Sequence, residues 1–137
     1  MRDLGGKLME YIDDISEIKS DQLQGFFVGW KYPLTQERHY ELLRGSSHFI
    51  VAMDDDMAVG FITALTDGVN SSFIPLLEVL PEYKNSGIGS ELVRRMLVKL
   101  ENTSNVDLTC DPGMQPFYER FNMLRSHGMV LRKYLHE

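Results

Sequence analysis

Apolar and polar positions in the middle of the chain follow the pattern of β-strands. Residues 48–53 and 57–65 are mostly apolar and are separated by three aspartates, which predicts a hairpin. Residues 72–80 are apolar on both faces apart from Glu78, as in a strand near the centre of a sheet. Pro75 cannot donate a ladder hydrogen bond, so we expect a bulge or an unpaired stretch beside it.

The pattern changes after residue 87, where apolar residues recur at helical spacing. Their steps of four, one, three, one and three residues place them on one face of a helix. They are Ile88, Leu92, Val93, Met96, Leu97 and Leu100. A second helix is expected over residues 36–44, with Thr35 as its N-cap. The other elements expected are short helices at 21–27, with Asp21 as the N-cap, and at 114–121, a strand at 106–110 and a final hairpin at 124–135.

The order of these elements predicts an α+β fold. Strands separated by helices imply a three-layer arrangement, with a mixed central sheet and helices on its faces. The chain has 137 residues, a length that fits one domain, and no repeat or linker rich in proline, glycine and serine interrupts it. We therefore expect residues 1–137 to form a single domain.

Composition and charge exclude several classes of function. The chain is 43% apolar and carries 14 basic against 20 acidic residues, a formal net charge of -6. Nucleic-acid binding needs a basic surface, so we expect no nucleic-acid partner. An acidic chain mildly favours cationic ligands, although solubility alone explains the same charge.

The sequence also predicts where the protein works. No apolar run is long enough to span a bilayer, and the N-terminus lacks the apolar stretch of a secretory signal. One cysteine, Cys110, excludes an internal disulfide and a multi-cysteine zinc site, and we expect it to be a small core residue. The three aspartates have no evident partner ligands, so no metal is expected. We expect a cytoplasmic protein without a membrane partner.

The segment with the clearest chemical signal joins the strand at 72–80 to the long helix. Gly87 and Gly89 lack a Cβ, so a ligand can approach their backbone closely. The first four amides of a helix have no internal acceptor, and with the helix dipole they form an anion site. Lys84 adds positive charge at the mouth of this loop. Two glycines that merely ease a strand-to-helix turn are the alternative explanation.

The sequence does not match two other phosphate-binding motifs. A P-loop requires Gly-Lys-Ser/Thr at its end, whereas Gly89 is followed by Ser90 and Glu91. A dinucleotide fingerprint requires a third glycine, and that position is Leu92.

The segment Val79-Leu80-Pro81-Glu82-Tyr83-Lys84-Asn85-Ser86-Gly87-Ile88-Gly89-Ser90 resembles the acetyl-CoA-binding motif of the GNAT superfamily, the GCN5-related N-acetyltransferases. That motif is Arg/Gln-x-x-Gly-x-Gly/Ala after a strand; here Lys84 replaces the Arg or Gln. A second segment, residues 116–123, resembles the family's later Phe-Tyr-x-x-x-Gly-Phe helix, with Asn122 in place of the glycine. Asparagine also suits a left-handed helix end.

The resemblance implies a GNAT-like acyl-CoA N-acyltransferase fold, with about six to seven mostly antiparallel strands and about four helices. It implies acetyl-CoA as co-substrate in a gap between splayed strands at 72–80 and 106–110. The backbone of Leu77 and Val79 would pair with the pantetheine arm. The loop residues would hold the diphosphate: Lys84, Asn85, Ser86, Gly87, Ile88, Gly89 and Ser90.

Two residues are candidates for proton transfer, Tyr118 from the resemblance and Glu78 from the pattern of its strand. Tyr118 matches the family tyrosine that acts as general acid toward the CoA sulfur; its alternative is a packed aromatic residue. Glu78 is the one carboxylate in an apolar strand, so desolvation suits it to act as base or to orient the amine. Its alternatives are a side chain that reaches solvent and a base made of ordered water, since Phe73 occupies the family's usual glutamate position. Asp111 could orient pantetheine.

The resemblance implies an acetyl-CoA-dependent N-acetyltransferase that acts by direct attack of a primary amine. The acceptor would be a small molecule, or a lysine or N-terminus of a protein or peptide. Trp30, Tyr32, Asp67 and Glu78 could form an aromatic and acidic pocket for a cation. The alternative is a non-catalytic acyl-CoA-binding or regulatory module on the same fold. A homodimer is possible, because family members often dimerise.

Overall fold

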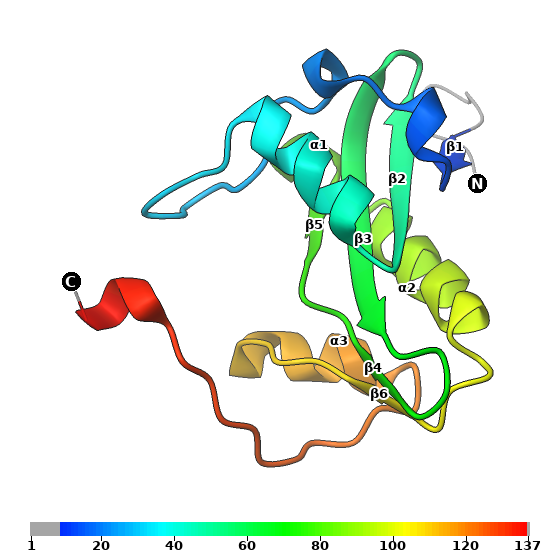
Figure 1. Ribbon diagram of the computed structural model, residues 1–137, viewed down its shortest axis with the longest axis vertical. Coiled ribbons are helices and arrows are strands. Elements are labelled where there is room, and N and C mark those ends of the chain that lie inside the picture. Colours follow the sequence, from blue (N-terminus) through cyan, green and yellow to red (C-terminus); the bar gives the residue numbers. More distant parts are fainter. Residues whose placement is uncertain (1–8, 137) are drawn as a thin grey trace. The chain divides into compact units, whose positions relative to one another are not determined.

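The computed structural model describes residues 9–136 (Figure 1). The chain divides into two compact units, Met1–Asp107 and Leu108–Glu137, and each is described by itself. The expectation of a single domain stays a prediction. Among residues 9–136, no helix is long and apolar enough to cross a membrane.

The first unit is built around one mixed sheet. In the described part of the chain this sheet has six strands, in the order β1-β2-β3-β4-β6, and β5 pairs with β3. All pairs are antiparallel except β4 with β6. The strands are β1 (Glu10–Ile12), β2 (His48–Asp54), β3 (Met57–Thr66), β4 (Ser71–Phe73), β5 (Leu77–Val79) and β6 (Asn105–Asp107).

The central hairpin is confirmed. β2 and β3 pair from His48↔Ala64 to Asp54↔Met57, and Asp55 makes the turn in a left-handed conformation (φ 54°). Aspartate tolerates this conformation because its short side chain can bond to the local backbone.

Helices α1 (Gln36–Gly45) and α2 (Ile88–Lys99) cover opposite faces of this sheet (Figure 1). Thr35 caps α1 as predicted: its Oγ1 accepts from the amide of Arg38 at 3.1 Å. The buried face of α2 packs on β2 and β3. Gly60 permits this approach, because a Cβ there would lie 3.2 Å from Ile88.

The strand predicted over 72–80 is interrupted at Pro75, as expected. Between the pairs Leu65↔Phe73 and Ile62↔Leu77, β3 advances three residues while its partner advances four. One extra residue is therefore accommodated as a bulge, which redirects the chain. β6 pairs with β4, and just after the paired residues the amide of Ile74 donates to the carbonyl of Asp107 at 3.0 Å. The parallel pairing with β6 therefore belongs to β4 and stops before β5 begins.

Two sequence predictions in the first unit are wrong. Residues 21–27 do not form an α-helix; the chain makes two 3-10 turns, η1 (Ile15–Glu17) and η2 (Ser20–Gln22), and Asp21 lies inside the second. The left-handed residues that follow, beginning with Gly25, exclude helical continuation. The strand predicted at 106–110 spans only residues 105–107, because its partner β4 ends at Phe73, two residues before Pro75.

The second unit contains the short helix α3 (Gln115–Glu119), preceded by the 3-10 turn η4 (Pro112–Met114). Asn122 is left-handed (φ 65°), as predicted for the end of this helix. The predicted hairpin at 124–135 is wrong. In the described part of this unit the chain forms no strand there and ends in the 3-10 turn η5 (Lys133–His136).

Cys110 is exposed, which corrects the expectation of a core cysteine. It follows the last residue of β6 by three positions and lies outside the strands and helices. His48, at the start of β2, is half-buried. His127 is exposed.

Candidate active site

β5 presents one unpaired backbone edge. On its other edge, the carbonyl of Leu76 accepts from β3 at 3.0 Å and the amide of Leu80 donates to β3 at 2.9 Å. Alternate residues of an antiparallel strand direct both backbone groups to the same side. Leu77 and Val79 therefore direct their N–H and C=O groups away from β3, toward an edge that no other described strand occupies. An extended ligand could add there as a further strand.

The chain turns sharply between β5 and α2. After the 3-10 turn η3 (Pro81–Tyr83), Lys84 closes the turn by donating its amide to Pro81 at 3.3 Å. Asn85 is left-handed (φ 63°), and the hydroxyl of Ser86 donates to the carbonyl of Tyr83. These contacts fix the loop in the shape that leads into the first turn of α2.

The N-cap of α2 is Gly87, which is left-handed (φ 88°) and offers no side chain to cap the helix. The amide of Glu91 donates to the carbonyl of Gly87 at 3.0 Å, and the helix geometry leaves the amides of Ile88 and Gly89 without intrahelical acceptors. Ile88 is buried and fixes the helix start, while Gly89 and Ser90 complete the first turn. A run of amides at the positive end of the dipole suits a phosphate group.

Glu78 makes contacts that its sequence position did not reveal. Its carboxylate accepts from the amide of Phe27 at 2.9 and 3.0 Å and from the amide of Val28 at 3.4 Å. Successive amides that converge on one anion form a backbone nest. The carboxylate therefore has backbone partners 50 residues away in sequence, and its predicted part in proton transfer stays a prediction.

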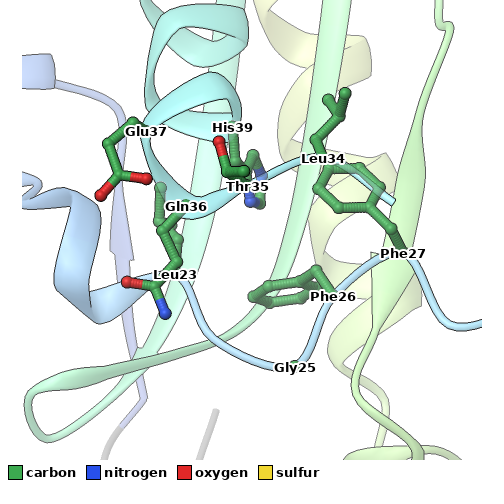
Figure 2. Close-up of a pocket in the computed structure, with 9 residues that line it drawn as sticks. All are labelled: Leu23, Gly25, Phe26, Phe27, Leu34, Thr35, Gln36, Glu37 and His39. Atoms are coloured by element: carbon green, nitrogen blue, oxygen red, sulfur yellow. The ribbon is translucent and has the colours of Figure 1, made fainter. Parts of the chain in front are cut away.

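A cavity of about 410 Å³ lies between residues 23–27 and the start of α1 (Figure 2). Its apolar lining includes Leu23, Phe26, Phe27 and Leu34, and its polar lining residues are Thr35, Gln36, Glu37 and His39. His39 is 1% exposed, and neither ring nitrogen has a partner. Burial lowers the pKa of His39 to about 4, so the ring is neutral at physiological pH.

Of the four residues predicted to form a cation pocket, none lines the cavity beside α1. Asp67 lines a different cavity beside the end of β3, and its Oδ1 accepts three amides in its own turn, from Val69, Asn70 and Ser71. These bonds lower the pKa of Asp67. Trp30 and Tyr32 lie on the loop that Glu78 contacts and are 44% and 57% exposed.

Tyr118 lies in α3 of the second unit and is half-buried. Burial raises its pKa to about 12, and the nearby Cys110 adds to this effect. The phenol is therefore protonated at neutral pH, as a general acid must be. Glu119, next to it, pairs with Arg125 at 2.9 Å.

Sequence reasoning missed the two amides that bind Glu78 and the buried His39. Gly25 and Gly29 flank Phe27 and were a local signal for an irregular turn. No local signal connected that turn with β5. His39 follows the apolar spacing of α1, but its burial against three phenylalanine rings, those of Phe26, Phe27 and Phe61, depends on distant segments.

The chain is similar to several solved structures. It is 39% identical to a proposed acetyltransferase from Deinococcus radiodurans R1, with a TM-score of 0.89, over 92% of this chain and 89% of that one. It is 27% identical to a GNAT family protein from Streptococcus pneumoniae TIGR4 (TM-score 0.74; 92% and 98% covered). The fold also matches AAC(6')-Iy in complex with the bisubstrate analogue CoA-S-monomethyl-acetylneamine (14% identity, TM-score 0.65; 93% and 98% covered).

No curated protein matches the chain significantly. The described residues form the predicted GNAT-like fold, a mostly antiparallel sheet of six strands, with three α-helices where about four were expected. The model of the acetyltransferase (GNAT) family matches residues 12–123, most of the sequence. The chain therefore belongs to the GNAT acetyltransferase family.

Proposed function

We propose that this protein transfers an acetyl group from acetyl-CoA to a primary amine by direct attack. The observation that carries the proposal is the unpaired edge of β5, which leads through a tight loop to the amides at the start of α2. A long, thin thioester carrier with a diphosphate has the two features that match this arrangement. Its amide-containing arm suits a strand edge, and its diphosphate suits a helix N-terminus.

The described residues fit such a carrier. Leu77 and Val79 would bond the pantetheine arm through their outward-directed backbone groups. The amides of residues 85–90 would receive the diphosphate, with the charge of Lys84 beside them. Gly87 leaves room for close approach, because it has no Cβ. The CoA analogue bound to AAC(6')-Iy supports this choice of carrier.

The reaction needs one proton removed and one supplied. The neutral amine attacks the thioester carbonyl, a C–N bond forms, and the C–S bond breaks as the tetrahedral intermediate collapses. Tyr118 would give its phenolic proton to the departing sulfur, and its raised pKa keeps that proton in place at neutral pH. Glu78 or an ordered water would accept the proton that the amine loses.

A panel of amines tests the proposal directly. Free CoA is followed by thiol detection while acetyl-CoA is offered with polyamines, aminoglycosides, amino acids and lysine peptides. We expect release above the hydrolysis background with at least one class. If calorimetry shows no binding of acetyl-CoA, or no class releases CoA above background, the proposal is refuted.

Tyr118→Phe separates an enzyme from a binding module. We expect this variant to lose at least tenfold in turnover while it binds acetyl-CoA with nearly unchanged affinity, because phenylalanine keeps the ring and removes the proton donor. Tyr134→Phe, which removes an exposed hydroxyl from the same unit, serves as the control. Equal turnover in wild-type and Tyr118→Phe protein would contradict the role of general acid.

A further inference from the structure

Phe27 has an unusual backbone that requires support. It is left-handed (φ 64°), which is costly for a large residue with a Cβ, and it stands between the left-handed Gly25 and Gly29. Such a conformation persists only where the surroundings hold it. Glu78 supplies that support from β5, because both oxygens accept the amide of Phe27 and one also accepts that of Val28.

The support extends to an exposed aromatic residue. We use the name Trp30 loop for residues 24–34, which connect η2 to α1. The ring of Phe27 is buried and packs against Trp30, with centroids 4.8 Å apart. The amide of Trp30 also donates to the carbonyl of Phe27 at 3.2 Å. The carboxylate on β5 is thus linked through one residue to Trp30.

The Trp30 loop also lies against the end of the strand proposed to receive the thioester carrier. A Cβ placed on Gly25 would be 3.4 Å from Cδ2 of Leu80, the residue after β5. Glu78 itself stands between Leu77 and Val79, whose backbone groups face the unpaired edge. One strand of three residues therefore carries the carrier edge and the anchor of the loop.

We infer that Glu78 is a positioning residue: it holds the Trp30 loop in the shape that receives the acceptor amine. This inference rests on the proposed function. Of the two proton acceptors proposed above, it selects the ordered water, because the carboxylate of Glu78 is occupied by the amides of Phe27 and Val28. A carboxylate with this role controls how well the amine binds, more than how fast the bound amine reacts.

The experiment compares Glu78→Ala and Glu78→Gln with Glu101→Ala, which removes an exposed glutamate beyond the end of α2. Trp30 is the one tryptophan of the sequence, so its fluorescence reports on the loop without any assay of activity. In Glu78→Ala we expect a red-shifted emission and about twofold stronger acrylamide quenching, with far-UV circular dichroism unchanged. Glu78→Gln keeps one acceptor oxygen and should fall between wild type and Glu78→Ala.

Steady-state kinetics then separate positioning from proton transfer. Each hydrogen bond to a charged group is worth about tenfold in an equilibrium, so Glu78→Ala should raise KM for the amine at least tenfold. We expect kcat to change less than about threefold, KM for acetyl-CoA to stay within about twofold, and the acidic limb of the pH profile to remain.

Two results would overturn the inference. One is Trp30 fluorescence in both Glu78 variants that matches Glu101→Ala. The other is a loss of about 100-fold or more in kcat at constant amine KM, with the acidic limb gone, which would make Glu78 the base. If wild-type protein turns over no amine, the proposed function and the acceptor role fail together. The fluorescence comparison still decides whether Glu78 holds the loop.

Discussion

The buried imidazole of His39 predicts a specific loss of stability in mild acid. Its ring is packed among Phe26, Phe27 and Phe61, and neither nitrogen has a hydrogen-bond partner. Burial lowers its pKa from 6.5 to about 4 in the folded protein. In the unfolded chain the same ring protonates near 6.5, so below that pH the unfolded state binds more protons than the folded one. Stability due to neutral His39 is therefore present above pH 6.5 and is lost as the pH falls toward 4.

The two pKa values set the magnitude. Linkage gives a loss of about 2 kcal/mol in the free energy of unfolding between pH 7 and pH 5, and a limit of about 3 kcal/mol at lower pH. The full difference between the two pKa values contributes to stability, because His39 is 1% exposed and solvent screens its charge little.

Urea unfolding of wild-type protein and His39→Leu at pH 7, 6 and 5 checks this value. The constant effect of the substitution cancels when each protein is compared with itself across pH, so only the slope matters. We expect the wild type to lose about 2 kcal/mol more than the variant between pH 7 and 5. Parallel slopes in the two proteins would refute the argument, because they would mean that His39 takes up no additional protons on unfolding.

Three further substitutions test the sheet and the carrier site. Gly60→Ala should destabilise the protein by about 1–3 kcal/mol in urea unfolding, because the new Cβ would lie 3.2 Å from Ile88 and 3.3 Å from Leu92; unchanged stability would contradict the close packing of α2. Gly87→Ala should weaken CoA binding about tenfold in calorimetry, because a residue with a Cβ needs about 1–2 kcal/mol to hold the φ of 88° found at this position. Unchanged affinity would refute this. Leu77→Pro removes an amide that faces away from β3, so it should weaken CoA binding while the melting temperature changes little; a large loss of stability would show that this amide belongs to the ladder.

Much of the fold could be predicted from patterns of residues that are close together in the sequence. The hairpin of β2 and β3, the amphipathic helix α2 and the Thr35 cap each depend on residues within a few positions of one another, and all three were predicted. The bulge at Pro75 was predictable for the same reason, since the missing amide is a property of that one residue. The glycine loop was also predicted from neighbouring residues, and the left-handed Gly87 agrees with the glycine that the motif has at this position.

The wrong predictions share a different physical cause. Residues 21–27 have an apolar spacing that suits a helix, yet their backbone is set by packing on β3 and by the carboxylate of Glu78. The contribution of partners far along the chain outweighs local helix propensity, which is a weak force for so short a segment. The tail at 124–135 has the turn residues of a hairpin, but a strand forms only where another strand supplies a ladder.

The bulge beside Pro75 explains why the proposed carrier edge and the anchor of the Trp30 loop lie on one short strand. An extra residue between β4 and β5 shifts the register on β3 by one, and a shift of one exchanges the two sides of a strand. The second edge of β4 pairs with β6, whereas no strand among residues 9–136 pairs with the second edge of β5. Without the bulge, the backbone groups of Leu77 and Val79 would face β3 and be consumed by its ladder. The bulge therefore leaves the edge proposed for the carrier, and Glu78, placed between those two residues, joins that edge to the Trp30 loop.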